Sequence, residues 1–412
     1  MKADDVYAIL NKKISAEEKK IDYLRECIAA SASPTTWKKV QKAIALGIHK
    51  EIYSIGDEFS NVWMDTNNSS KEYDNPLRIN HFSEEELEDG TTIPGIWLQT
   101  HYAQLKSVQF SHQRAFLACP DGLQAGTYYF TMESKWGNNV AAGDVVCFTI
   151  TKDVPAGGRI SGCYGAPDQE KSTWKIYTHS ADGKTVLETV MPTFEANGTD
   201  LGIQKNSSRN GNLNSCQEMA YGWNRWKTSA YRQYMNSDKP KGEWWTAQDE
   251  WDIAPEQLTS IDGYLCGMDP ELLDVIKPVK TVTYTNTVND GGGVDITYDK
   301  VIIPSLEQMY VNPQIAGEGD AHGYYRELNG TETKYAQYGT YPELKHYAVD
   351  NHMAAQHARL RSAVRGHSCS VWFVTTSGLV AGLSASSAFR CAPLVFIGQN
   401  PAISAPTDAE IN

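Results

Sequence analysis

The sequence predicts an α+β, β-rich protein with an N-terminal helical region, an all-β module and a larger C-terminal domain. Short apolar stretches bounded by Gly, Asn, Asp and Pro recur from residue 52 onward, which is typical of strands and turns. Helical periodicity is strong only in the first fifty residues. With 412 residues, of which 41% are hydrophobic and 10% aromatic, the chain is long enough to form several buried cores.

Residues 1–50 are expected to form a helical attachment or oligomerisation region. The segment 3–30 has the heptad pattern of an amphipathic helix. Its apolar positions are Tyr7, Leu10, Ile14, Ile21, Leu24 and Ile28. Because a helix of this length is marginal in isolation, we expect it to pack on a partner subunit or a larger assembly. The alternative is that it caps its own domain.

A second short helix is expected directly after this region. Thr35 or Thr36 can cap its start, and Gly47 can end it. Its apolar face comprises Trp37, Val40 and Ile44.

The next two segments read as β structure. In 51–115 we expect strands at 53–59, 95–103 and 108–112, with solvated polar loops at 66–73 and 84–89. The segment 116–205 has the strand spacing of a sandwich or barrel, and we interpret it as an inserted all-β module. Its expected strands are 126–132, 145–151, 175–178 and 186–190.

The segment after residue 206 is unusually aromatic. Five tryptophans lie between residues 221 and 251, at Trp223, Trp226, Trp244, Trp245 and Trp251. A short helix capped by Thr228 or Ser229 is expected here, and a second begins at Asp269 and Pro270.

Three interpretations of this aromatic belt are open: a hydrophobic core, a sugar-binding platform, or a glycosidase site that uses Asp249 with Glu250 or Asp252. A glycosidase needs two facing carboxylates about 5–9.5 Å apart, which neighbours on one loop do not provide. We therefore favour the core.

Charge and cysteine usage exclude several classes of protein. A net charge of −13 with a sequence pI near 5.3 argues against a nucleic-acid surface. No apolar run reaches the roughly 18 residues of a membrane helix, and the start of the chain lacks the pattern of a secretory signal. The eight Cys and ten His are dispersed without zinc or redox spacing, so no metal and no cofactor is expected. A bridge between Cys369 and Cys391 is conceivable.

The segment 359–398 has a distinctive composition. From residue 361 to 398 it contains no Lys, Asp, Glu, Gln, Asn, Met or Tyr. It reads as two strands joined by a Ser377-Gly378 turn, a loop of small residues, and a last strand at 391–397. A buried terminal hairpin is one explanation, because charged residues are rare in buried strands.

The motif RLRSA…VWFVTTSGLV…AFRCAPLVFIG resembles the C-terminal end of a domain family of gut bacteria and phages. NRWKTSAYRQYMNS…GEWW and DITYDKVIIPSLEQMY extend this resemblance over about 206–400, and it touches 50–115 loosely. That family resembles the C-type-lectin fold of formylglycine-generating enzymes and of diversity-generating-retroelement variable proteins. The resemblance implies a C-type-lectin-like domain at 206–412, split from 51–115 by the inserted module.

In those variable proteins, a C-terminal segment is rewritten through template adenines, commonly in AAY codons that cannot yield Lys, Glu, Gln or Met, and the absence of these four residue types from 361–398 fits that rule. The resemblance implies a ligand-binding surface on a frame of Trp372, Val374, Pro393 and Val395. The ligand-binding residues would be Val364, Gly366, His367, Ser368, Cys369, Ser370, Phe373, Leu379, Ala381, Leu383, Ser384, Ser386 and Phe389. The wide spacing of Cys369 and Cys391 departs from the cysteine pair of the formylglycine-generating enzymes, which argues against oxidase chemistry.

The function expected from these observations is binding, and the chain is not expected to be an enzyme. The expectation is a phage or prophage structural protein of the receptor-binding or tail-tip type, made in the bacterial cytoplasm and placed in the virion. Its partners would be a host cell-surface protein or glycan, other virion proteins and further copies of itself, but neither nucleic acid nor a membrane interior. The alternatives are a virion assembly protein that binds only other virion proteins, and a glycan-acting enzyme.

Overall fold

The computed structural model describes residues 37–112 and 223–399, except 249–251, 253, 287–289, 291 and 366–368. It also describes helical residues between 10 and 21, Gln124, and the backbone of strands between 116 and 218. Within these residues the fold is mixed and β-rich with few, short helices, which confirms the α+β class. None of the described helices has the length and apolar character required to cross a bilayer.

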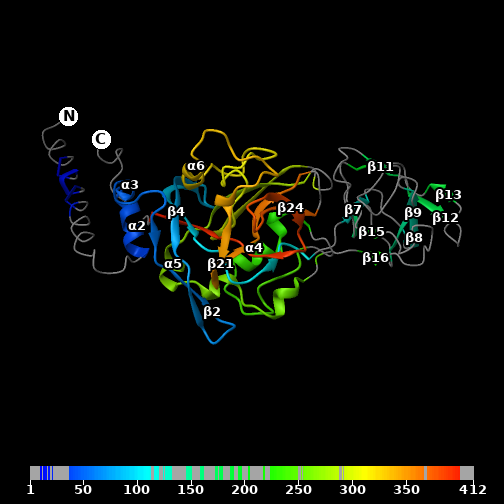
Figure 1. Cartoon of the computed structure of the whole chain (residues 1–412), viewed down its shortest axis with the longest axis horizontal. Helices are drawn as coiled ribbons and strands as arrows, with labels where there is room; N and C mark the ends of the chain where they lie inside the picture. Colours follow the sequence, from blue (N-terminus) through cyan, green and yellow to red (C-terminus); the bar gives the residue numbers. More distant parts are fainter. Residues whose placement is uncertain are drawn as a thin grey trace.

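The main body is built on a five-stranded antiparallel sheet that joins distant parts of the chain (Figure 1). In spatial order its strands are β1 (Glu58–Phe59), β4 (Leu77–Glu86), β5 (Thr92–Thr100), β26 (Leu394–Gly398) and β19 (Val301–Ile302). Strand β26 lies between β5 and β19 and pairs with both. The segments on either side of the predicted insertion therefore contribute to one sheet.

Helix α2 (Trp37–Ala45) packs on β5 and β26, and α3 (His49–Ile52) follows it. The predicted apolar face of α2 is buried in the main core. Gly47 follows the helix with a φ of 71°, a left-handed conformation that favours glycine at a helix end. The first and last residues of α2 thus agree with the prediction. Both candidate N-caps, Thr35 and Thr36, lie outside the described residues.

The other helices are short. They are α4 (Ala230–Met235), α5 (Pro270–Val275) and α6 (Gly323–Asn329), with 3-10 turns η1 (Trp226–Thr228), η2 (Glu256–Thr259), η3 (Tyr264–Gly267) and η4 (Pro342–Leu344). Ser229 caps α4, because its Oγ accepts a hydrogen bond from the backbone N–H of Arg232 at 3.0 Å. Asp269 caps α5 through the N–H of Glu271 at 2.8 Å. Both caps were among those predicted.

The aromatic belt is mainly core, as we favoured. Trp223, Trp226 and Trp244 are buried, and Trp245 is half-buried. Trp226 and Trp244 belong to the same cluster as the central sheet. Trp251 lies outside the described residues.

The C-terminal half adds three antiparallel units. They are the hairpin β17 (Val279–Tyr284)–β18 (Val294–Asp299), the hairpin β20 (His346–Ala348)–β21 (Asn351–Gln356), and the sheet β22 (Ala358–Ala363)–β23 (Ser370–Val374)–β24 (Val380–Ser384). The predicted turn joins β23 to β24, with Gly378 at a φ of 88°. Strand β25 (Ala388–Phe389) pairs with β6 (Val108–Gln109), which links the C-terminal half to the first β segment again.

Two predicted loops are partly strand. The loop expected at 66–73 is the turn and second strand of a hairpin, β2 (Val62–Asp65)–β3 (Lys71–Asp74). In the loop expected at 84–89, Glu84, Glu85 and Glu86 continue β4, because β5 offers them paired partners from Thr92 to Pro94. Glu85 is half-buried, so the interpretation of this acidic run as a solvated loop was wrong.

Directly after β19, residues 306–310 form hydrogen-bonded turns. The side chain of Gln308 accepts from the N–H of Ser305, a local bond that competes with helix formation. Helix α6 and the β20–β21 hairpin were not predicted, since 311–357 has weak periodicity.

The strands between 116 and 218 form small antiparallel sheets, including β13-β12-β8-β9. Figure 1 places them at one end of the molecule. They are β7 (Phe116–Cys119), β8 (Gly126–Thr131), β9 (Val145–Ile150), β10 (Gly158–Ser161), β11 (Ser172–Trp174), β12 (Ile176–His179), β13 (Val186–Thr189), β14 (Phe194–Ala196), β15 (Ile203–Gln204) and β16 (Gln217–Glu218). Four of them coincide with the predicted strands.

At the opposite end of the molecule, the described residues between 10 and 21 are helical, in agreement with the predicted first helix. The heptad residues Leu10, Ile14 and Ile21 are exposed.

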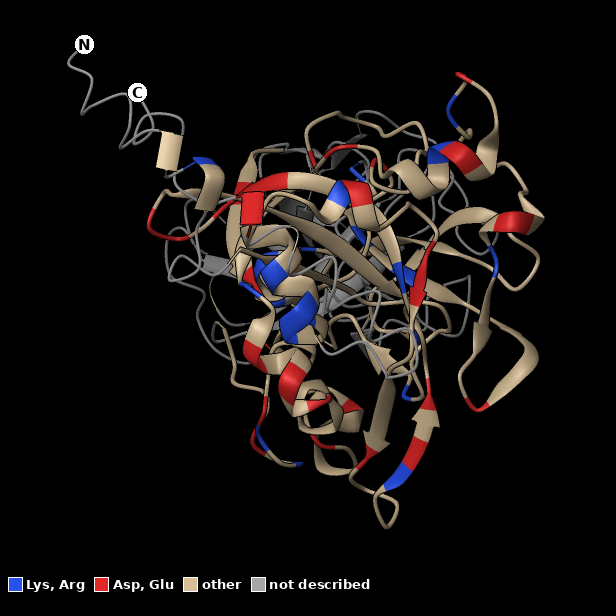
Figure 2. Cartoon of the chain, turned by 90° about the vertical axis from the view of Figure 1, so that its left-hand side faces the viewer, with Lys and Arg blue, Asp and Glu red and all other residues tan. Residues whose placement is uncertain are grey.

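On the face that carries α2 and α3, acidic and basic residues are interspersed (Figure 2).

Candidate functional site

The C-terminal sheet β22–β23–β24 carries five of the thirteen predicted ligand-binding residues: Ser370, Phe373, Ala381, Leu383 and Ser384. All six residues of β22 are buried, and so are four of the five residues of β23. Strand β24 is only partly covered. Any contact surface on this sheet is therefore formed by β24 and the loop that follows it.

Arg359, in β22, holds this surface from beneath. Its side chain is fully buried, and its guanidinium donates four hydrogen bonds to carbonyl oxygens. The acceptors are Val371 (3.3 Å), Leu383 (3.4 Å), Ser384 (3.1 Å) and Ser387 (2.8 Å). The guanidinium also lies 4.5 Å from the ring centroid of Phe389, a cation–π contact.

The charge of Arg359 is stabilised by the dipoles of these carbonyl groups, since no acidic side chain among the described residues forms an ion pair with it. Burial lowers the pKa of Arg359 to about 9, which still leaves it charged at neutral pH. All four acceptors are main-chain atoms. These bonds therefore fix the conformation of β24 and the following loop without involving the side chains of the acceptor residues.

A second set of contacts closes the loop 364–370. The N–H of Val364 donates to the carbonyl of Ser370 at 2.9 Å. Asn224 donates from Nδ2 to the carbonyl oxygens of Val364 (3.3 Å) and Ser370 (2.8 Å). Arg365 reaches the carbonyls of Thr285 and Gly292, both at 3.2 Å. The base of this loop is thus also held through main-chain atoms.

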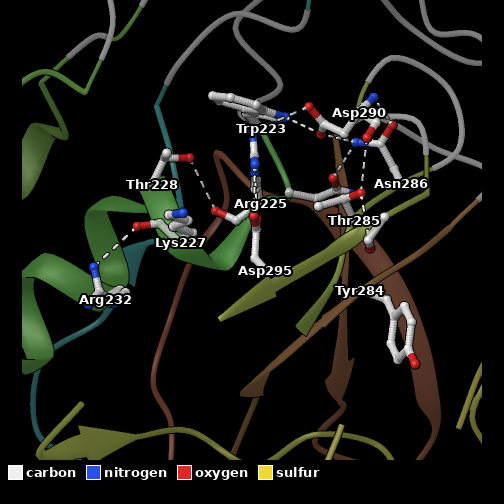
Figure 3. Close-up of polar contacts among 12 residues, drawn as sticks. Trp223, Arg225, Lys227, Thr228, Arg232, Tyr284, Thr285, Asn286, Asp290 and Asp295 are labelled. Carbon is white, nitrogen blue, oxygen red and sulfur yellow. Dashed lines mark hydrogen bonds and ion pairs between the residues drawn. The ribbon is translucent and has the colours of Figure 1, made fainter. Parts of the chain in front are cut away.

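Asn224 is itself fixed by a polar network at the end of the β17–β18 hairpin (Figure 3). Asn286 donates from Nδ2 to Asn224 Oδ1 at 2.9 Å and to Asp290 at 2.5 Å. Trp223 Nε1 donates to the same Asp290 carboxylate at 2.7 Å (Figure 3). This network connects the loop to the β17–β18 hairpin.

Beside it, Arg225 forms a two-pronged ion pair with Asp295 at 2.5 and 2.8 Å (Figure 3). The hydrogen bonds to this carboxylate raise the pKa of Arg225. Paired guanidinium and carboxylate groups of this geometry are rigid, which supports a structural role for the network.

The predicted ligand-binding residues differ in exposure. Leu383 is 42% exposed, whereas Val364, Cys369 and Phe373 are buried beneath the sheet. The half-buried ones are Ser370, Leu379, Ala381, Ser384, Ser386 and Phe389, while Gly366, His367 and Ser368 lie outside the described residues. We define the hairpin surface as Leu379, Ala381, Leu383, Ser384 and Ser386. The predicted frame residues Trp372, Val374, Pro393 and Val395 are buried.

The remaining sequence candidates are the two cysteines and the three acidic residues of the aromatic belt. Cys369 and Cys391 are both buried and are not bridged to each other. Asp249 and Glu250 lie outside the described residues, and Asp252 accepts a hydrogen bond from the N–H of Gln248. In the described part of the chain, no group of three or more His, Cys, Asp or Glu side chains could hold a metal ion.

The structure also contains a polar cavity that sequence reasoning missed. Its volume is about 390 Å³, and it lies where the end of β4, the start of β17 and the segment 317–322 meet. Its walls include His81, Glu85, Asp320, His322 and Arg361. The one sequence signal was the acidic run at 84–86, whose assignment to a loop concealed that Glu85 belongs to a strand.

A comparison with family models gives one match, a domain of unknown function (DUF6273), over residues 199–396. The match covers just under half of the chain and includes Arg359, Asn224 and the hairpin surface. No curated protein matches the chain. No solved structure matches it either.

Proposed function

We propose that this chain is a non-catalytic binding protein whose hairpin surface contacts a ligand, on a C-terminal domain of the C-type-lectin type. One observation carries the proposal. Arg359 holds the displayed strand and loop through four main-chain carbonyls, so the surface side chains are not needed to maintain their own backbone. Such an arrangement suits a surface whose side chains differ between variants.

The loop 364–370 supports the same proposal. Asn224 holds the main-chain carbonyls of Val364 and Ser370 at the two ends of the loop, without involving the side chains of those residues. Arg365, by contrast, is a side chain of the loop that anchors it to the carbonyls of Thr285 and Gly292, so it would have to stay unchanged. A diversified segment needs such anchoring of its backbone, because a substitution that altered the backbone would destroy the scaffold together with the contact.

The biological setting that we propose is a phage or prophage structural protein of the receptor-binding or tail-tip type, located in the virion. The composition of 361–398 and the resemblance to retroelement variable proteins support it. The exposed heptad residues Leu10, Ile14 and Ile21 support self-association through the N-terminal helix. Several weak contacts on one oligomer would then combine into strong attachment to a host cell-surface protein or glycan.

A second candidate function is a virion assembly protein that binds only other virion proteins. The burial of Val364, Cys369 and Phe373 favours it, since these side chains add nothing to an exposed contact area in this structure. The two candidates differ in what they require of the hairpin surface. Attachment requires variation there, whereas assembly requires constancy.

The test is to sequence codons 359–398 of this gene in many isolates from one population. Attachment through a diversified surface predicts amino-acid changes at the hairpin surface and in 366–368, with Arg359, Asn224 and Trp372 unchanged. Constant sequence, or silent changes spread evenly over the segment, would contradict diversification and leave the assembly role.

A matched binding experiment complements the survey. The purified full chain would be incubated with intact cells from a panel of gut bacteria, and bound protein measured by flow cytometry. Leu383→Asp should abolish binding to any strain that the parent chain binds. Met353→Asp, at a residue that is 89% exposed on β21, is the control and should retain binding.

A further inference from the structure

The polar cavity has walls from several separate parts of the chain, including Trp97 of β5 and Arg361 of β22. His81 and Glu85 come from β4, Lys280 comes from β17, and Asp320 and His322 come from the segment before α6. None of the residues that line it belongs to the hairpin surface. An inference about this cavity is therefore independent of the proposed function.

Two imidazoles form one wall. The rings of His81 and His322 stack with centroids 5.3 Å apart and planes 13° apart, and the ring of Trp97 lies 5.8 Å from that of His322. Burial lowers the pKa of both histidines, so both rings are neutral at pH 7 and each has one nitrogen lone pair. In His81 that lone pair is on Nδ1, which accepts from the N–H of Gly323 at 3.4 Å.

His322 is left unsatisfied by the protein. Its side chain is 1% exposed, and its Nδ1 has no hydrogen-bond partner among the described residues. A buried polar atom without a partner is costly, which is why such atoms often mark a place where a ligand or water belongs.

Glu85 contributes an acidic side chain to the cavity. Trp97 Nε1 and Ser83 Oγ both donate to its Oε1, at 2.7 and 2.6 Å. These contacts orient the carboxylate while engaging only one of its two oxygens. Burial raises the pKa of Glu85, and the nearby Asp320 raises it further, because two carboxylates at one site repel each other.

The basic side chains of the cavity are already engaged. Lys280 pairs with Glu86 at 2.8 Å. Arg361 donates to the carbonyl of Ile303 at 2.9 Å, and also to the carbonyl of Glu318 and to Gln308 Oε1. Among the described residues, by contrast, no ion pair involves Glu84, Glu85 or Asp320. The cavity therefore has an excess of negative charge.

We propose that this cavity binds a primary ammonium group on a small organic molecule or on a lysine side chain. An ammonium group is positively charged and therefore complements the negative carboxylates. It also has three N–H donors, for which carboxylate oxygens and a neutral imidazole nitrogen are suitable acceptors. The volume of about 390 Å³ is at the small end of ligand sites, which suits a group of this size. A metal ion is disfavoured, because the described residues contain no group of three or more ligands for one.

Calorimetry on the full chain tests this with paired probes that differ in the charged group. Glucosamine is compared with glucose, and Nα-acetyllysine amide with its Nε-acetylated form. We expect saturable binding of at least one of the two amines and none of its neutral counterpart. Binding of glucosamine alone indicates a small-molecule ligand, and binding of the lysine amide alone indicates a protein partner.

A pair of variants locates the binding in the cavity. Glu85→Gln removes the charge but keeps an oxygen to accept from Trp97 and Ser83, and it should weaken amine binding about tenfold or more. Glu88→Gln, at an exposed residue that does not line the cavity, is the control and should bind as the parent does. The proposal is overturned if neither amine binds at millimolar concentration, if the neutral probes bind equally well, or if both variants behave alike. Should Glu85→Gln unfold, Asp320→Asn at an exposed position replaces it with the same expected loss.

Discussion

Replacing Arg359 by methionine is the most direct test of the contacts that hold the hairpin surface. The substitution keeps a long unbranched side chain in the buried space but removes all four donors. The carbonyl oxygens of Val371, Leu383, Ser384 and Ser387 then lose a charged hydrogen-bond partner. We expect a clear loss of stability.

Two opposing contributions determine how much stability Arg359→Met loses. Burial of the guanidinium lowers its pKa to about 9, which corresponds to a cost of about 5 kcal/mol that methionine does not have to meet. Against this, a hydrogen bond from a charged donor contributes about 1.5–3 kcal/mol, so the loss of four costs roughly 8 kcal/mol. The expected net loss is about 3 kcal/mol.

Urea unfolding followed by tryptophan fluorescence measures this loss, since Trp226 and Trp372 are both buried. Arg326→Met is the matched control, because Arg326 is exposed and faces an exposed Glu332 at 3.8 Å. Exposed ion pairs contribute at most about 1 kcal/mol, so the control should hardly shift the midpoint. Leu383→Ser at the hairpin surface should also cost less than about 1 kcal/mol. A small effect of Arg359→Met, or an equal effect of Leu383→Ser, would refute the idea that the backbone is held independently of the displayed side chains.

Two further predictions concern stability. Burial lowers the pKa of His346 to about 3 in the folded protein, so the unfolded chain binds the proton first, and stability falls as the pH drops from 6.5 toward 3. His346 should account for about 1.4 kcal/mol per pH unit of this fall, so His346→Gln should make the slope shallower by that amount in urea titrations across this range; an unchanged slope would contradict the assignment. Gly378→Ala should cost well over 2 kcal/mol in the same assay, because an added Cβ would clash with the carbonyl oxygen of Tyr341 at a position with φ of 88°. Gly242→Ala has the same φ but open space around it, so it should show only the backbone strain of about 1–2 kcal/mol, and equal losses would rule out the clash.

Local signals explain the parts of the fold that the sequence predicts. The cap of α4 at Ser229 and that of α5 at Asp269 are bonds between residues two or three positions apart, and such patterns are visible in a sequence. The β23–β24 turn is of the same kind, because Gly378 takes a conformation that glycine favours. The position of β26 between β5 and β19 depends on pairs such as Gln99–Leu394 and Val301–Val395, which are far apart in the chain and which no local pattern records.

The candidate sites were harder to predict for a related reason. The acceptors of Arg359 are carbonyl groups, which every residue has, so nothing in the sequence of the hairpin marks it as the partner of an arginine. The cavity depends on several distant segments, and its most informative residue, Glu85, lies in an acidic run whose composition resembles that of a solvated loop. Only the pairing of β4 with β5 establishes which of these carboxylates is covered.

Arg359 and Arg361 give the RLRSA motif a physical explanation. Both are buried guanidiniums in β22, and both use carbonyl groups as acceptors. Arg359 holds the hairpin surface, whereas Arg361 holds the carbonyls of Ile303 and Glu318 beside the cavity. Because a buried charge tolerates little movement of its acceptors, β22 is a rigid connection between the hairpin surface and the cavity. Both proposals, a variable hairpin surface and an ammonium-binding cavity, therefore require that Arg359 and Arg361 in β22 stay unchanged.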